Sequence, residues 1–251
     1  MDKKTLAVLG CGASFQNEEI ALSLDCEYAD MQTTLLPARL RRRTSIATKM
    51  AFSAAERACA NAGIEPCELP VIFTSSLGES AVTDQLCRNI ASQSFPLSPT
   101  KFHNSVHNTA SGYWSIAVKS THPAMAMGGY QDSFALALLE AWSQLYTVEK
   151  KVLLVCYEET PSDLLLPENH WQACATAFVL STEQQLDHDA LGYVTMPYRA
   201  ERLEPVLDDK LFSPATAALL LYKALNKKLK TVIDISPAAE QAWFIEICAD
   251  A

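Results

Sequence analysis

The sequence lacks the features that would place it outside the ordinary globular proteins. None of its apolar runs approaches the ~20 residues that a membrane-spanning helix needs, and the run Leu6–Leu9 is too short for the core of a signal peptide. It has no low-complexity stretch of the kind that marks a disordered linker. The net charge is −9 and the isoelectric point is near 5.0, which argues against nucleic acid as the main partner. We therefore expect a cytoplasmic protein without a membrane span.

Motifs for metal, redox and hydrolase chemistry are also missing. The chain has eight cysteines, but they are scattered through apolar segments and no two form a C-x-x-C pair. Neither a zinc site nor a thioredoxin-like motif is indicated, and we expect free buried thiols in a reducing compartment. There is no G-x-S-x-G elbow, which argues against a serine hydrolase. We expect no cofactor and no metal.

What the chain does have is an alternation of short apolar runs with segments of helical periodicity. Helices are predicted at 45–62, with Ser45 as the cap and Gly63 as the stop, and at 79–92, 104–119 and 132–146. Buried strands are predicted at 5–9, 70–75, 124–128, 151–158 and 173–181. Strands too apolar to face water, alternating with helices, indicate an α/β layered fold.

The character of the chain changes after about residue 185. Strands are predicted at 191–200, 231–235 and 243–248, with a helix at 214–228. No linker separates this tail from the rest. We expect residues 1–185 to form the main unit and residues 186–251 a small second lobe packed on it, the two making one structural unit.

The most informative stretch is the predicted strand–turn–helix between residues 124 and 146. Many enzymes place a nucleophile at such a turn, because the helix N-terminus stabilises developing negative charge. In this chain the turn reads Gly128-Gly129-Tyr130-Gln131-Asp132. None of these residues is an obvious nucleophile.

Three segments resemble the thiolase-like β-ketoacyl synthases, and more closely the short proteins similar to the N-terminal half of that family. Pro37–Ser45 (PARLRRRTS) leads into an Ala-rich helix, as at the start of the family's first core helix. Val106–Gly112 (VHNTASG) is similar to the family's Asn-x-x-Ala-Gly helix. Tyr130–Ala141 (YQDSFALALLEA) stands where an active synthase has Ala-Cys-Ala-Ser-Gly and an apolar helix. The resemblance covers about residues 1–185 and implies a thiolase-like layered fold, with one complete half and a reduced second lobe.

The resemblance places Gln131 at the position of the nucleophilic cysteine. A condensing enzyme needs a thiolate there to hold the acyl chain as a thioester, and an amide does not form that bond. The family's C-terminal motifs His-Gly-Thr-Gly-Thr and an Asn in a Gly-rich loop are absent, and only His170 and His188 lie beyond the first half. The resemblance therefore implies no catalytic residue and no condensing activity of the chain by itself.

Glutamine at this position resembles the chain-length factors, the non-condensing partners of type II ketosynthases. Very short members of this kind accompany aryl-polyene and related fatty-acid-like pathways. The resemblance implies a heterodimer with a full-length ketosynthase, formed by antiparallel pairing of strand 123–127, and contact with an acyl carrier protein through that complex. It also places the helix from His103 to Trp114 beside the partner's acyl tunnel, with Asn104, Asn108 and Tyr113 as candidates for the tunnel floor and the interface.

Several alternatives stay open at this stage. The protein could be an assembly partner that does not shape the tunnel, or a Gln-type malonyl decarboxylase, although the latter needs the missing histidines. Gln131 could instead be a surface turn residue of an unrelated α/β protein. Cys174, in the run ACATAF, superficially looks like a synthase motif, but its strand-like context favours a core thiol.

Two clusters of charged or polar residues also have more than one interpretation. His103 and His107 share a face if they lie on one helix, as metal ligands do in HExxH enzymes, but no Glu stands between them. Packing or hydrogen bonding at an interface is the alternative. The basic residues between Arg39 and Arg43 offer a docking surface for an acidic carrier protein. A solvated stretch or interface salt bridges explain them equally well.

Overall fold

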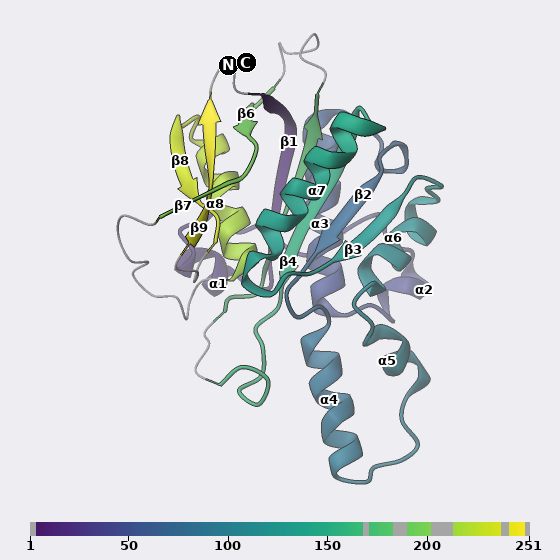
Figure 1. The fold of residues 1–251 in the computed structure, drawn as a ribbon. Coiled ribbons are helices and arrows are strands. Elements are labelled where there is room, and N and C mark those ends of the chain that lie inside the picture. Colours follow the sequence, from purple (N-terminus) through teal and green to yellow (C-terminus); the bar gives the residue numbers. More distant parts are fainter. Residues whose placement is uncertain (1–3, 168–170, 183–189, 202–212, 237–240, 249–251) are drawn as a thin grey trace.

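The computed structural model describes residues 4–167, 171–182, 190–201, 213–236 and 241–248. Their strands form one nine-stranded mixed sheet in the order β3-β2-β4-β5-β1-β6-β9-β7, and β8 pairs with β9 beside this path (Figure 1). The strands are β1 (Thr5–Phe15), β2 (Val71–Thr74), β3 (Ala124–Met127), β4 (Lys151–Glu158), β5 (Cys174–Ser181), β6 (Gly192–Thr195), β7 (Tyr198–Glu201), β8 (Thr231–Asp234) and β9 (Gln241–Cys248).

The helices connect and cover these strands. They are α1 (Glu18–Ser23), α2 (Ala38–Arg41), α3 (Ile46–Ala62), α4 (Ser80–Ala91), α5 (Pro99–Asn104), α6 (Thr109–Val118), α7 (Ser133–Thr147) and α8 (Pro214–Asn226), with 3₁₀ turns η1 (Pro66–Glu68) and η2 (Tyr130–Asp132). No helix within the described ranges is long and apolar enough to cross a membrane.

The sheet changes from parallel to antiparallel along its width. β3, β2 and β4 run parallel, whereas β5 pairs antiparallel with both β4 and β1. β1 also pairs antiparallel with β6 and so joins the strands of the tail to those of the first part of the chain. β3 is the terminal strand at the parallel end, where it is bonded to β2 alone among the described strands.

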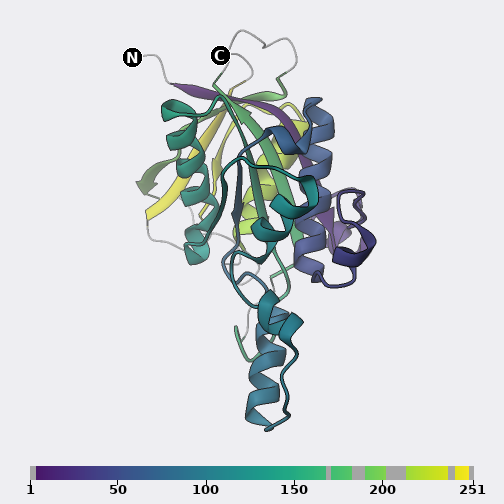
Figure 2. The ribbon, with the colours of Figure 1, turned by 90° about the vertical axis from the view of Figure 1, so that its right-hand side faces the viewer.

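Two hydrophobic cores lie on the two faces of the sheet. The first contains the buried sides of α7 and α8, including Phe134, Leu138 and Leu221, and the second those of α3 and α6, including Phe52 and Trp114. Figure 2 shows α7 and α3 on opposite sides of the sheet. α8 contacts β1, β4 and β5 and also β8, so it packs against strands of the first part of the chain and of the tail. α4 projects from the body as an arm (Figures 1 and 2).

The close approach of α3 to β1 explains two glycines in β1. A Cβ at Gly10 would lie 2.3 Å from the Ala58 carbonyl oxygen, and one at Gly12 would lie 2.3 Å from that of Ala54. No other residue fits between this strand and this helix. The predicted ends of α3 are confirmed: Ser45 Oγ accepts from Thr48 N at 3.0 Å, and Gly63 ends the helix with a φ of 65°.

Two of the predicted elements are wrong. The helix predicted at 104–119 begins later, as α6 at Thr109, because the chain turns at residues 105–108 and Asn104 ends the separate helix α5. Thr109 Oγ1 donates to the carbonyl oxygens of Asn104 (3.1 Å) and Val106 (2.7 Å), which would otherwise continue the helical ladder. The strand predicted at 191–200 is also two strands, β6 and β7, interrupted at Pro197, which has no backbone N–H to donate.

Candidate functional site

The turn between β3 and α7 is the candidate site. Gly128 and Gly129 leave the end of β3, and η2 leads into α7. Ser133 ties the turn together, because its Oγ donates to the Tyr130 carbonyl oxygen (2.6 Å) and accepts from Gly129 N (2.9 Å). Tyr130 has a φ of 53°, in the left-handed region that non-glycine residues rarely adopt. Such strained residues cluster at functional sites, and here the strained residue directly precedes Gln131.

His107 packs against this turn from the α5–α6 connection. Its Nε2 lies 2.9 Å from the Ser75 carbonyl oxygen, and because a carbonyl only accepts, Nε2 carries the proton. A Cβ at Gly128 would lie 3.1 Å from the same Nε2 and 2.8 Å from the Ser75 oxygen. Gly128 is therefore required by close packing. This contact joins the C-terminal end of β2 and the α5–α6 connection to the β3–α7 turn.

Gln131 lies in η2, half-buried, and its side chain has no hydrogen bond to another described residue. Its neighbours on both sides are held in place: the Tyr130 ring lies 6.3 Å from that of Trp171, and the Asp132 carboxylate is 3.7 Å from Arg199 Nη2. The glutamine amide is thus presented by an ordered turn at the start of a 15-residue helix.

Among the described residues, no side chain near the turn is suited to act as a nucleophile. Ser133 is fully buried and its hydroxyl is committed to the turn. Cys174 lies in β5 and Cys156 in β4, both with no exposed surface, and burial raises the pKa of each thiol well above its ordinary value. Cys174 is therefore a core thiol, as its strand-like context indicated. Within the described residues, the turn offers hydrogen-bonding groups and no thiolate.

A network of buried carboxyl groups supports the site and was missed by the sequence reasoning. Glu158, the last residue of β4, has no exposed surface. Its carboxylate accepts from Ser75 Oγ (3.1 Å), from Leu77 N (3.4 Å) and from Ser76 N. Desolvation raises its pKa to about 8, although these donors act in the opposite direction. The only sequence signal was a Glu pair directly after an apolar strand.

Two further glutamates hold the segment that follows. Glu159 Oε1 accepts from Ser80 Oγ (2.9 Å) and Ala81 N (2.5 Å), at the first turn of α4. Glu79, which is 1% exposed, accepts from Thr48 Oγ1 at 2.6 Å, and burial raises its pKa to about 7. Together the three carboxyl groups fix the β2–α4 loop and the base of the projecting arm beside the turn.

The structure separates the three candidates for the tunnel floor. Asn104 is 4% exposed, accepts from Tyr113 OH at 3.0 Å, and donates to the Arg43 carbonyl oxygen. Tyr113 is 7% exposed. Asn108, at the start of α6, is exposed and lies next to His107. The expected single helix from His103 to Trp114 is wrong, because α5 ends at Asn104 and α6 begins at Thr109.

The same break separates His103, in α5, from His107, so these histidines do not share a helix face. Within the described ranges no group of His, Cys, Asp and Glu is arranged to hold a metal ion. His170 and His188 lie outside the described residues.

The basic cluster is on the surface around α2. Arg39, Arg42 and Arg43 are exposed and form no ion pair within the described part of the chain, whereas Arg41 Nη2 donates to the carbonyl oxygens of Thr33 (3.3 Å) and Leu36 (3.0 Å).

Comparison with solved structures identifies the fold. The chain is similar to a chain of the ketosynthase ApeO in complex with its chain length factor ApeC from Xenorhabdus doucetiae, with 20% identity, a TM-score of 0.71, and coverage of 96% of this chain and 99% of that one. A type II polyketide synthase complex of ketosynthase AntDE with acyl-carrier protein AntF gives 13% identity and a TM-score of 0.69, covering 98% and 100%. The ishigamide ketosynthase/chain length factor gives 15% identity and a TM-score of 0.62, with coverage of 89% of this chain and 73% of that one.

At these identities the structures show a shared fold, the thiolase-like ketosynthase fold that the sequence predicted. No curated protein matches the sequence. The family of β-ketoacyl synthase N-terminal domains matches residues 16–225, which is most of the chain and includes the β3–α7 turn. The protein therefore belongs to the β-ketoacyl synthase family, which it matches through that family's N-terminal domain.

Proposed function

We propose that this protein is a non-condensing, chain-length-factor-like subunit that pairs with an active β-ketoacyl-ACP synthase and shapes its acyl tunnel in polyene or fatty-acid-like biosynthesis. The observation that carries the proposal is Gln131 at an ordered turn where a condensing member of the family needs a thiolate. The buried thiols of Cys156 and Cys174 offer no substitute, because desolvation keeps them protonated and no acyl donor reaches them.

The absence of condensing activity is tested by incubating the purified chain with an acyl-carrier thioester and measuring its intact mass. We expect no acylated protein. Gln131→Cys should gain an acyl adduct at most, and no condensation, because the decarboxylating motifs are missing from the sequence. A stable adduct on the unmodified chain would refute the proposal. Cys174→Ala is the matched control, since loss of such an adduct in this variant would assign it to the one thiol in a synthase-like context.

The proposed partner surface is the free edge of the sheet at β3. Ala124 and Met125 are exposed, and β3 is bonded to another described strand on one side only. α6 contacts β3 and exposes Ile116, of which 66% is accessible. A short apolar edge strand next to an exposed apolar helix is a template for another strand and is prone to aggregation when uncovered. Antiparallel pairing with the same strand of the ketosynthase would cover it, in an obligate interface of about 2,000 Å² or more.

Co-expression with a full-length ketosynthase, followed by size-exclusion chromatography, tests this surface. We expect a heterodimer with the wild-type chain and its loss with Met125→Glu, because a charge would be buried next to the paired strand. Leu22→Glu is the matched control, since Leu22 is 69% exposed on α1 and its substitution should leave the complex intact. A wild-type chain that stays monomeric at micromolar concentration beside every candidate synthase would contradict the pairing.

Control of chain length is proposed for the exposed Asn108 rather than for all three candidates equally. A tunnel ends where a side chain occupies the volume of the next two carbons, and overpacking an apolar pocket costs ~1–3 kcal/mol. Asn108→Ala should therefore lengthen the product of the reconstituted pair, and Asn108→Trp should shorten it, with the heterodimer intact. Product distributions unchanged by substitutions at Asn104, Asn108 and Tyr113 would favour an assembly partner that does not shape the tunnel.

Docking of an acyl carrier protein at the basic surface around α2 belongs to the same proposal. Its support is the exposure of Arg39, Arg42 and Arg43 and their lack of ion pairs within the described residues, on a chain with a net charge of −9. Exchanging all three for Gln should slow turnover of the reconstituted complex, and raising the salt concentration should reduce the difference between variant and wild type. Equal rates at low salt would exclude this surface.

A further inference from the structure

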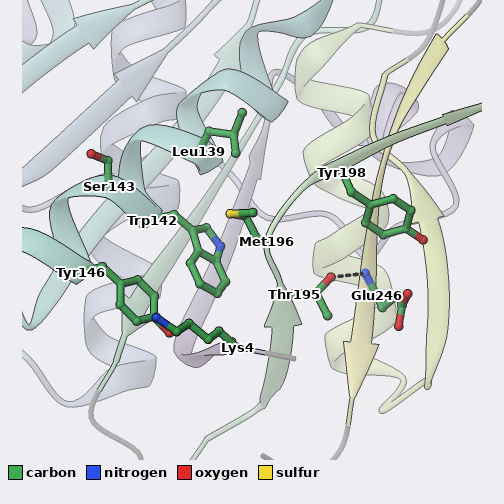
Figure 3. A pocket seen from close by; sticks show the side chains of 9 residues that line it. All are labelled: Lys4, Leu139, Trp142, Ser143, Tyr146, Thr195, Met196, Tyr198 and Glu246. Carbon is green, nitrogen blue, oxygen red and sulfur yellow. Dashed lines mark hydrogen bonds between the residues drawn. The ribbon is translucent and has the colours of Figure 1, made fainter. Parts of the chain in front are cut away.

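A groove of about 950 Å³ lies beside α7, on the side of the strands β6, β7 and β9. Its walls are the outer side of α7 and the strands β6, β7 and β9, which stand at the opposite end of the strand order (Figure 3). The lining residues of α7 come eight or more positions after Gln131 in the sequence. At a rise of 1.5 Å per residue, they lie roughly 12 Å or more beyond Gln131 along the helix. No lining residue of the groove belongs to β3 or to the β3–α7 turn, although β7 also reaches the turn through the ion pair of Arg199 with Asp132.

The lining is mainly apolar. Leu139, Trp142 and Tyr146 follow one side of α7 at helical spacing, and Met196 enters from the β6–β7 connection. The rings of Trp142 and Tyr146 stack on each other, with centroids 5.0 Å apart and an interplanar angle of 11°. Met196 is 53% exposed, although a thioether is a side chain that usually fills apolar gaps. Its exposure leaves one wall of the groove adaptable and open.

The charged groups lie at the two ends of the groove. Lys4 Nζ stands 4.7 Å over the centre of the Tyr146 ring and forms no ion pair with a described residue. Glu246 lies across the groove in β9, where its backbone N–H donates to Thr195 Oγ1 at 2.9 Å (Figure 3). An ammonium group with no counter-ion in the described part of the chain, at the border of an apolar groove, favours an anionic group at that end.

These features together indicate one class of ligand. Pockets for small ligands have volumes of ~300–1,000 Å³ and are mostly apolar with a few polar groups that fix orientation. The stacked rings already cover part of each other's faces, which disfavours a flat aromatic ligand, whereas Leu139 and Met196 suit a flexible hydrocarbon. We propose that this groove binds the hydrocarbon chain of a long-chain carboxylic acid, with the carboxylate at Lys4. The proposal does not rest on pairing with a ketosynthase.

Calorimetric titration of the full chain, in its partner complex if it requires one to stay soluble, tests the site with dodecanoate as the probe. We expect saturable binding at one site per chain. Met196→Trp and Ser143→Trp place an indole in the groove from opposite walls, and each should weaken binding about tenfold or more. Leu22→Trp is the matched control, because it adds the same side chain at an exposed position of α1.

The head group is tested separately. Lys4→Gln should weaken dodecanoate about threefold or more while leaving dodecanol unchanged, and dodecyltrimethylammonium should bind the wild type more weakly than dodecanoate. The absence of saturable dodecanoate binding would overturn the proposal, and so would equal binding by the wild type and both Trp variants. A self-associating wild type made monomeric by Met196→Trp, with no effect of dodecanoate, would also overturn it, because the groove would then bind protein.

Discussion

Replacing Glu158 by Gln should change how the stability of the protein depends on pH. Burial raises the pKa of Glu158 from its ordinary value of 4.5 to about 8, so the native state binds a proton that the unfolded state has already released between these two values. The free energy of unfolding therefore falls as the pH rises through this window, by at most ~1.4 kcal/mol per pH unit. Between pH 5 and 7 the loss due to this one group is roughly 2.5 kcal/mol.

Gln is a neutral isostere of the protonated acid, so Glu158→Gln should remove this part of the pH dependence. The variant keeps an acceptor for Ser76 N but places an NH₂ group near the donors of Ser75 or Leu77, so we expect it to lose ~1–3 kcal/mol at pH 5. A smaller fall of the free energy of unfolding with rising pH should persist in the variant, because burial raises the pKa values of Glu79 and Glu159 as well.

Urea unfolding of both proteins at pH 5, 6 and 7, followed by far-ultraviolet circular dichroism, gives the three free energies needed for each. Glu68→Gln is the control, since Glu68 is exposed in η1 and its loss should leave the slope of the wild type unchanged. The reasoning is refuted if wild type and Glu158→Gln lose stability at the same rate, or if the wild type becomes more stable between pH 5 and 7.

Three other substitutions test the packing around the site. Gly12→Ala should destabilise the protein by ~3 kcal/mol or more in thermal unfolding, because its Cβ would lie 2.3 Å from the Ala54 carbonyl oxygen. Gly112→Ala is the control: a Cβ there meets no atom within 4 Å, so this substitution should be neutral or slightly stabilising. Asn104→Ala should cost ~1–3 kcal/mol in urea unfolding, since it leaves buried partners unpaired; an unchanged midpoint would contradict this. Asp132→Asn should change the unfolding free energy by less than ~1 kcal/mol, because its ion pair with Arg199 is partly exposed; a larger loss would show that the turn depends on it.

The sequence predicted the elements whose signals are local. Periodicity located α3 and α7, and the Ser45 cap and Gly63 stop gave both ends of α3, because a cap is a contact between residues three or four apart. The buried strands β4 and β5 were recognisable as short apolar runs bounded by polar residues. The strand–turn–helix that presents Gln131 followed from these signals, and the family resemblance followed from Tyr130–Ala141 together with Pro37–Ser45 and Val106–Gly112.

Features that depend on distant contacts were not predicted. No local signal marked Glu158 and Glu159 as a buried pair, and only the fold brings the β2–α4 loop and the first turn of α4 over them to supply five donors. The groove beside Trp142 needs α7 next to strands more than 45 residues further along the chain, and no periodicity in either segment encodes that proximity.

The break between α5 and α6 shows how a helical pattern gave a wrong local structure. Helical periodicity across residues 104–119 places Asn104 and Asn108 one turn apart on one face, where both would shape the same cavity. The side chain of Thr109 instead takes up the carbonyl groups that end α5, and His107 bonds to the Ser75 carbonyl oxygen. Asn104 is thereby buried against Tyr113, and Asn108 is left exposed beside the contact with Gly128. Substitution of Asn104 should therefore change stability, and only substitution of Asn108 should change the shape of the surface offered to a partner.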